Sequence, residues 1–280
     1  MKPQDYPIVT LSDGNRMPQF GLGVWQASSG GDAEHAVSDA LKAGYRLIDT
    51  AAVYMNEEDV GRAIAASHIP REQLFITTKL WNSEQGADKV RPALLESLRK
   101  LGVDYVDLYL IHWPTPGRDL YVETWKEFEK LREEGLVKSI GVSNFEIEHL
   151  ERLARETDTV PVVNQIELHP GFSQPELRAY CAAHGIAVES WSPIGGSRGS
   201  ILDHPVVVAI ASRFHKTPAQ VVIRWHLQHG LIVIPKSIHT ARIKENFDVF
   251  DFVLDDEAMT AIDAIEGTRQ GPDPNTMNHG

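Results

Sequence analysis

Three ionisable residues end consecutive β-rich runs of the chain, and a tyrosine follows the first of them. Asp49 closes one run and precedes Tyr54, Lys79 closes the next run, and His112 closes the one after. A tyrosine titrates near about 10, and a neighbouring ammonium group lowers that pKa by stabilising the phenolate. Asp49 can hold Lys79 in place and charged, and His112 can donate a hydrogen bond to a substrate oxygen. Together these groups suit the protonation of a carbonyl oxygen on which negative charge develops.

The elements that must position these side chains alternate between strand and helix. Eight short β-rich runs recur along the chain, and several of them have the continuous apolar pattern of parallel strands covered on both faces. These runs are Phe20–Trp25, Arg46–Thr50, Phe75–Leu80, Asp107–His112, Val137–Asn144, Val162–Glu167, Ala187–Trp191 and Ile232–Lys236. Amphipathic helices, each followed by a glycine that can end it, are predicted over Asp32–Ala43, Asp88–Leu101, Tyr121–Glu134 and Gln174–His184.

This alternation predicts an α/β fold, specifically a (β/α)8 TIM barrel. An open doubly wound sheet is the rival fold, but it more naturally has about five to seven strands. Barrel enzymes carry their catalytic groups at the carboxyl ends of the strands, and neighbouring strands lie about 4.8 Å apart. We therefore expect Asp49, Lys79 and His112 to share one pocket.

Two segments fall outside the repeat. The stretches Ile8–Leu11 and Arg16–Pro18 flank a strong turn, so a β-hairpin is expected to close the bottom of the barrel. The tail from Gly267 to Gly280 is rich in Gly, Pro and Asn and is expected to be loop. Since no linker interrupts the pattern, residues 1–280 are predicted to form a single domain.

Composition excludes several classes of partner. A formal net charge of −12 argues against nucleic acid and anionic membranes. No apolar run is long enough for a signal peptide or a membrane helix. Cys181 is the single cysteine, so no intrachain disulfide can form, and we interpret it as a small buried residue. These features predict a cytoplasmic protein, and a monomer is expected because no oligomerisation element stands out.

Three motifs in order along the chain carry a family resemblance. Gly44–Ala51 with Tyr54 following, Asp104–Pro114 around His112, and Ile234–Ser237 are similar to signatures of the aldo-keto reductases. The similarity runs from Leu11 to about Ile265 and is nearest to short bacterial members resembling 2,5-diketo-D-gluconate reductase. It implies NADPH-dependent reduction of aldehydes, ketones or dicarbonyls to alcohols. In that reaction Tyr54 would be the general acid, tuned by Asp49 and Lys79, while His112 orients the carbonyl; no metal is implied.

The resemblance also implies which residues hold the cofactor. The nicotinamide is expected at Ser143, Asn144, Gln165 and Trp191, and the pyrophosphate at a loop with Ser192, Ile194, Gly195 and Ser197. The 2′-phosphate is expected at Lys236, Ser237 and Arg242, and the adenine at Glu245 and Asn246. Two cations and a hydroxyl favour NADPH over NADH. No Rossmann fingerprint is present, since Gly21-Leu22-Gly23 lacks a third glycine at the right spacing.

The substrate pocket is expected to have an aromatic wall. Trp25, Trp81 and Trp113 follow or end barrel strands on the catalytic side, next to His112. The chain departs from the family at Met55, where a glycine usually follows the tyrosine, and we expect this side chain to narrow or reshape the pocket. The segment after Trp191 is short, so the long cofactor-clamping loop of mammalian members is expected to be missing. The short tail predicts an exposed pocket. His239 stands where relatives often carry another cation, which leaves the strength of the NADPH preference open.

Two other functions use the same residues. A nicotinamide-binding sensor or regulatory subunit could be built on this barrel, although the complete set of Asp49, Tyr54, Lys79 and His112 favours catalysis. A Schiff-base aldolase acting through Lys79 is a further alternative. Asp49 opposes it, because an adjacent carboxylate keeps the amine protonated.

Overall fold

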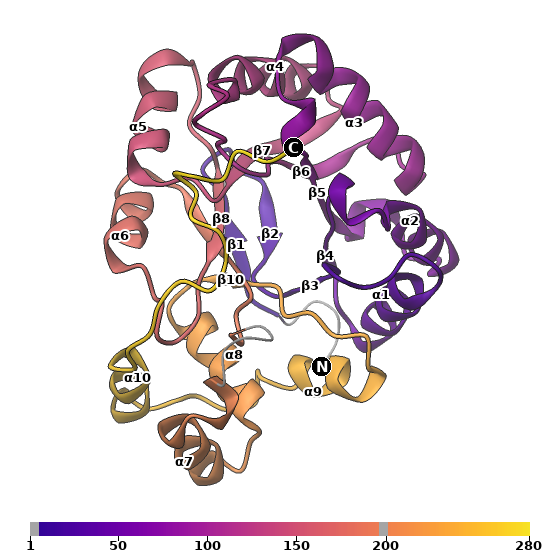
Figure 1. Ribbon diagram of the computed structural model, residues 1–280. Helices are drawn as coiled ribbons and strands as arrows, with labels where there is room; N and C mark the ends of the chain where they lie inside the picture. Colours follow the sequence, from indigo (N-terminus) through magenta and orange to yellow (C-terminus); the bar gives the residue numbers. More distant parts are fainter. Residues whose placement is uncertain (1–5, 196–200) are drawn as a thin grey trace.

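The computed structural model describes residues 6–195 and 201–280 and shows a ring of parallel strands surrounded by helices (Figure 1). The 8-stranded sheet runs in chain order from β3 to β10. Its strands are β3 (Gly21–Gly23), β4 (Leu47–Asp49), β5 (Phe75–Leu80), β6 (Val106–Ile111), β7 (Val137–Ser143), β8 (Val163–Glu167), β9 (Ala187–Trp191) and β10 (Ile232–Val233). A parallel bridge between Phe20 and Val233 joins the first strand to the last. The predicted barrel is therefore confirmed.

Helices follow the strands and cover the outside of the barrel (Figure 1). They are α1 (Asp32–Ala43), α2 (Glu57–Ala66), α3 (Ala87–Leu101), α4 (Tyr121–Glu133), α5 (Ile147–Glu156), α6 (Pro175–Ala183), α7 (Pro205–Phe214), α8 (Pro218–Gln228), α9 (Thr240–Phe247) and α10 (Asp256–Asp263). Short 3-10 turns are η1 (Ala52–Tyr54), η2 (Arg71–Gln73), η3 (Asn82–Glu84) and η4 (Ile201–Asp203). Gly44 and Gly102 end α1 and α3 in the left-handed conformation that the sequence predicted.

A β-hairpin covers the amino-terminal end of the barrel. Strands β1 (Ile8–Thr10) and β2 (Arg16–Pro18) pair antiparallel, with Ile8 opposite Pro18. Met17 of this hairpin is fully buried against a cluster that includes Leu47 and Phe75 at the starts of their strands. The hairpin thus plugs the end opposite the strand carboxyl termini, as expected.

The main core lies between the strands and the helices. Trp125 of α4 and Trp225 of α8 are fully buried there, which agrees with their place on helical stripes. Cys181 is also buried and behaves as a small apolar residue. Within the described ranges, no helix combines the length and apolar character needed to cross a bilayer.

A glycine on α2 allows close contact with α3. A Cβ added at Gly61 would lie 2.6 Å from the carbonyl oxygen of Leu101. That oxygen belongs to the backbone, so it cannot move aside without shifting the end of α3.

We predict that Gly61→Ala destabilises the fold. An alanine normally stabilises a helix relative to glycine, but here overpacking should lower the free energy of unfolding by about 1–3 kcal/mol. Urea denaturation measures the change. Ala65→Ser on the exposed face of α2 is the matched control and should have little effect. A gain in stability for Gly61→Ala would show that the two helices can separate at low cost.

Candidate active site

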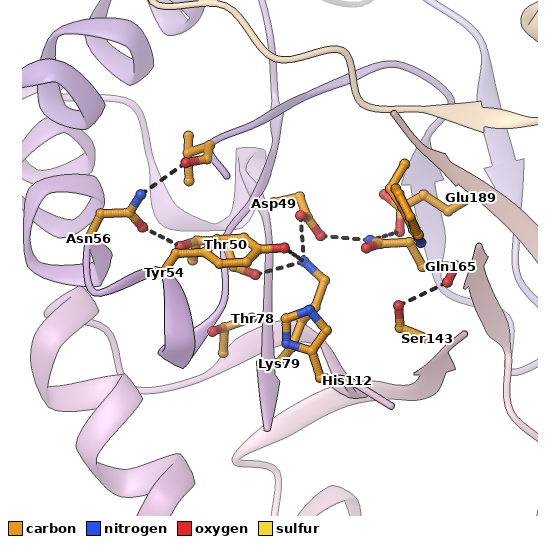
Figure 2. A network of polar contacts seen from close by, with 12 residues as sticks. Asp49, Thr50, Tyr54, Asn56, Thr78, Lys79, His112, Ser143, Gln165 and Glu189 are labelled. Carbon is orange, nitrogen blue, oxygen red and sulfur yellow. Dashed lines mark hydrogen bonds and ion pairs between the residues drawn. The ribbon is translucent and has the colours of Figure 1, made fainter. Parts of the chain in front are cut away.

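A cavity of about 710 Å³ opens at the carboxyl ends of the strands and contains the predicted catalytic groups. Asp49 reaches it from the end of β4, His112 from the residue after β6, and Tyr54 from η1. Lys79 of β5 lies directly beneath and is fully buried. The structure therefore brings the four side chains together, as the strand-end argument required (Figure 2).

Lys79 is the centre of this cluster. Its Nζ donates hydrogen bonds to Asp49 Oδ1 at 2.6 Å and to the carbonyl oxygen of Thr50 at 3.0 Å. It also lies 3.3 Å from the hydroxyl oxygen of Tyr54 (Figure 2). All three ammonium protons are thus directed at oxygen atoms, and the lysine points its charge at the phenol.

Burial and charge act against each other on this ion pair. Burial alone would lower the pKa of Lys79, but the charges of Asp49 and then of Tyr54, together with the hydrogen bond to Asp49, raise that pKa. Burial raises the pKa of the Asp49 carboxyl, while Lys79 acts to lower it. Lys79 is therefore an ammonium ion at neutral pH, and it is held in place by a partner on the neighbouring strand.

The pKa of Tyr54 differs in its net direction from the sequence prediction. Burial raises this pKa above its ordinary value; Lys79 lowers it, as predicted, but does not outweigh burial. The phenol consequently stays protonated across the neutral range, which suits a proton donor. During proton transfer the substrate oxygen accepts the proton. Lys79 then stabilises the negative charge that develops on the phenol oxygen.

His112 is a neutral imidazole. Burial, and secondarily the charge of Lys79, lower its pKa well below the ordinary value. Among the described residues no partner hydrogen-bonds its buried Nδ1 atom. The ring lies edge-on to both Tyr54 and Trp81, with ring centres 5.7 and 5.3 Å away. A neutral histidine here can donate a hydrogen bond without adding a second positive charge beside Lys79.

Hydrogen bonds hold the segment that follows β4 in place. Thr50 Oγ1 donates to Asn56 Oδ1 at 2.9 Å, and the amide of Asn56 donates to the carbonyl oxygens of Val24 and Ala27.

Met55 adopts the left-handed conformation, with φ 58°, and its side chain is 71% exposed. It is not among the residues that line the cavity. The expectation that Met55 narrows the pocket is therefore wrong, because the left-handed backbone turns this side chain outward.

The residues expected around a nicotinamide form one hydrogen-bonded group. Ser143 Oγ donates to the carbonyl oxygen of Gln165 at 2.9 Å. Asn144 donates from Nδ2 to the carbonyl oxygen of His112 at 3.0 Å and accepts from Trp191 Nε1 at 2.8 Å. Ser143 and Trp191 end β7 and β9, Asn144 follows β7, and Gln165 is the middle residue of β8; all of them line the cavity.

The segment after β9 lines one side of the cavity. Ser192 and Ile194 contribute to the lining, whereas Gly195 does not; Ser197 lies outside the described residues. The carbonyl oxygen of Pro193 accepts a hydrogen bond from His226 Nε2 at 2.9 Å. Burial lowers the pKa of His226 to about 3, so the ring is neutral when it makes this bond. The sequence analysis did not identify this anchor from α8.

The residues expected around a 2′-phosphate surround the start of α9. Lys236 lines the cavity, whereas Ser237 and Arg242 lie outside its lining. Within the described ranges, neither Lys236 nor Arg242 forms an ion pair, so both cations are available to an anion. Glu245 accepts a hydrogen bond from Thr217 Oγ1 at 2.9 Å, and Asn246 is buried; neither lines the cavity.

Comparison with known proteins identifies the family of this chain. Residues 19–266 match the Aldo/keto reductase family. An aldo-keto reductase of Mycolicibacterium smegmatis is 58% identical over 97% of this chain and 98% of its own length. The methylglyoxal reductase DkgA of Escherichia coli is 54% identical over 95% of this chain and 96% of its own. A crystal structure of a Gox0644 mutant with NADPH has a TM-score of 0.91 at 50% identity, covering 98% of this chain and 99% of that one.

The chain belongs to the aldo/keto reductase family.

The expected aromatic wall of this reductase is in place. Trp25, Trp81 and Trp113 all line the cavity; Trp25 is 53% exposed, whereas Trp113 is buried. Several lining residues were not identified from the sequence, and they are Gly23, Gln26, Val53, Pro193, Ile234, Gly271 and Pro272. The ends of the strands could have indicated Gly23 and Ile234. Nothing in the sequence placed the tail residues here.

The tail of the reductase crosses the barrel mouth (Figure 1, yellow). The backbone N–H groups of Gln270 and Gly271 donate to the two oxygens of Glu167 at 2.6 and 2.8 Å. Further along, the carbonyl oxygen of His279 accepts from Asn82 Nδ2 at 2.6 Å. Glu167 and Asn82 thus hold the tail over one side of the cavity, where Gly271 and Pro272 join the lining. The exposed pocket expected from the short tail stays a prediction; on the lining, Trp25 is 53% exposed.

Metal-binding side chains do not gather in the described part of the reductase. No group of three or more His, Cys, Asp or Glu residues there could hold an ion. His169 lies buried with its Nε2 3.1 Å from Glu167 Oε1. Glu167 and His169 are thus engaged with each other and with the backbone.

We predict that Glu167→Gln releases the tail. Burial would raise the pKa of Glu167, but hydrogen bonds from His169 and from the two tail amides outweigh burial and lower it. The attachment is therefore complete above the unfolded pKa of about 4.3 and is lost as the pH falls through the lower folded pKa. Hydrogen exchange at Gln270 and Gly271 should accelerate at least about tenfold in the variant.

The exposed Glu176→Gln on α6 is the matched control for that measurement. It should leave exchange at the tail unchanged. Equal exchange rates in wild type and Glu167→Gln would mean that the carboxylate does not anchor the tail.

Proposed function

We propose that this reductase transfers a hydride from NADPH to an aldehyde, ketone or dicarbonyl, with Tyr54 donating the proton to the carbonyl oxygen. The observation that carries the proposal is the position of Lys79 Nζ, 2.6 Å from Asp49 Oδ1 and 3.3 Å from the phenol oxygen of Tyr54, beneath the cavity. Membership of the family supports carbonyl reduction as the reaction. The whole chain is proposed to act as one barrel domain.

The cofactor is NADPH, as the family indicates, and when bound it supplies the hydride. The residues present fit it. Gln165 and Asn144 offer amide oxygens to a carboxamide, and Trp191 offers a ring face. Lys236 and Arg242, which form no ion pair with the described residues, offer two cations to a 2′-phosphate. Solved relatives bound to NADPH and NADP support this assignment.

Four side chains of this protein then have separate roles in the reaction. The phenol of Tyr54 gives its proton to the carbonyl oxygen, and the resulting phenolate is stabilised by Lys79. The neutral imidazole of His112 donates a hydrogen bond that orients the same oxygen. Asp49 keeps Lys79 charged and fixed, and its two oxygens accept hydrogen bonds from Lys79 and Gln165. In oxidation of an alcohol, Tyr54 would take the proton back.

Small carbonyl compounds are the proposed substrates. Trp25, Trp81 and Trp113 present aromatic surface, and the tail at Pro272 closes one side. Such a wall binds a short carbon skeleton and keeps water from the reacting atoms. Relatives named methylglyoxal reductase support dicarbonyls as the first class to test.

The alternatives fit the structure less well. A Schiff-base mechanism requires an unprotonated Lys79, whereas Asp49 raises the pKa of that lysine. A sensor or regulatory subunit has no need for a lysine buried beneath a cavity and aimed at a phenol.

We predict that Tyr54→Phe lowers kcat for NADPH-dependent reduction by about 10² to 10⁴, the contribution expected of a general acid. The dissociation constant of NADPH, measured by fluorescence quenching, should stay unchanged because the phenol contacts the substrate. Tyr105→Phe is the control: this tyrosine lies before β6, with Arg71 4.2 Å above its ring. Unchanged turnover in Tyr54→Phe would remove the phenol from the mechanism.

We predict that Arg242→Ala weakens NADPH binding by about 10- to 100-fold and leaves NADH binding unchanged. The reason is the loss of a charge-assisted contact to a phosphate that NADH lacks. Titration with each cofactor measures the ratio. Arg213→Ala is the control, because this arginine pairs with Asp255 at the cap of α10 and with Glu257 on α10. Equal weakening for both cofactors would place the 2′-phosphate elsewhere.

A further inference from the structure

A second carboxyl group lies buried next to the catalytic ion pair. Glu189 is in β9, opposite Gln165 of β8 on one side and Ile232 of β10 on the other. Its side chain is fully buried, and it does not line the cavity. The proposed reaction gives Glu189 no role. An ionised carboxylate in this buried position would carry a large desolvation cost.

One amide group links Glu189 to the catalytic cluster. Gln165 Nε2 donates to Asp49 Oδ2 at 2.8 Å and to Glu189 Oε2 at 2.8 Å (Figure 2). Only the nitrogen of an amide can donate to two carboxyl groups, so these contacts fix which way the side chain faces. The amide oxygen of Gln165 is left for the cavity, which this residue lines.

The other oxygen of Glu189 has no partner among the described residues. Its Oε1 atom is buried without a hydrogen bond. A charged oxygen in that situation would bear the full cost of desolvation, whereas a carboxylic acid avoids most of it. Burial, followed by the charge of Asp49, raises the pKa of Glu189 to about 8. Geometry and electrostatics therefore both favour the protonated form at neutral pH.

We propose that Glu189 is a positioning residue that acts through Gln165. As a neutral acid it accepts one hydrogen bond from the Gln165 amide, directs the oxygen of that amide into the cavity, and leaves the ion pair of Asp49 and Lys79 without a competing charge. The inference rests on the proposed function, because Gln165 is there assigned to the nicotinamide carboxamide.

The charge state of Glu189 matters to the proton donor. The charged groups that face it are Asp49 from β4 and Lys79 from β5, while β10 presents the apolar Ile232. When Glu189 is neutral, the negative charge of Asp49 is balanced by Lys79. When Glu189 ionises, the buried cluster carries one extra negative charge, which raises the pKa of Tyr54 and opposes the charge developing on the substrate oxygen.

The test is the pH dependence of kcat for carbonyl reduction. Wild type should lose about tenfold in kcat as the pH rises through the pKa of Glu189, about 8. Tyr54 and Lys79 have pKa values raised above 10.0 and 10.5, so they titrate at higher pH. Glu189→Gln is neutral at every pH and still accepts from Gln165; it should keep kcat at pH 7 within about threefold and lose the decline near pH 8.

Two further variants separate this role from a merely structural one. Glu189→Leu removes the acceptor and should raise the dissociation constant of NADPH about tenfold, because Gln165 loses one of its two partners. Glu57→Gln is the matched control: Glu57 is also buried, accepts from Thr78 Oγ1 at 2.7 Å and has one unpartnered oxygen, but it does not contact Gln165. It should keep the wild-type pH profile.

A measurement without turnover distinguishes this inference from the proposed function. The infrared difference spectrum of wild type minus Glu189→Gln should show the carbonyl stretch of a protonated acid at pH 7, and the band should disappear above about pH 8. Absence of the band at pH 7, or an unchanged pH profile in Glu189→Gln, would overturn the assignment. If wild type reduces no carbonyl compound but shows the band, the proposed function fails and the neutral acid stands.

Discussion

The buried ion pair between Lys79 and Asp49 is the interaction on which the site depends. An ammonium group inside a protein is tolerated only with a close partner and with its protons satisfied. The barrel meets this requirement by placing β4 and β5 side by side, with Asp49 2.6 Å from Lys79 Nζ. The remaining directions of the ammonium group are taken by Thr50 and by the phenol of Tyr54. The charge that tunes the proton donor thus cannot move away from it.

The surroundings of this pair limit further charge. His112 is held neutral by burial and by Lys79, and it is therefore a hydrogen-bond donor that does not compete for Asp49. Gln165 occupies the second oxygen of Asp49 with an uncharged group. At the rim of the site, Lys236 and Arg242 are exposed, so their positive charges are accessible to water or to an anion. The site has a compact charged centre, neutral walls and an outer cationic edge.

Much of this arrangement could be predicted, because strand ends in a barrel converge. The runs that became β5 and β9 have the bounds that the pattern predicted, and Asp49, Lys79 and His112 share one site. Predictions that depended on local conformation or burial did worse. Met55 faces outward because of its backbone angle, and burial outweighs Lys79 in setting the pKa of Tyr54. Neither quantity is visible in the order of the residues.

The sequence by itself determined the periodic alternation of strand and helix, and with it which ionisable residues stand at the same end of the barrel. It could do so because periodicity and strand-end chemistry are local properties. Only the tertiary structure decided how the tail lies over the barrel mouth and that His226 hydrogen-bonds the carbonyl oxygen of Pro193. It also decided that the amide nitrogen of Gln165 donates to both Asp49 and Glu189. These contacts join residues far apart in the chain, and their energies depend on burial, which exists only once the barrel has closed.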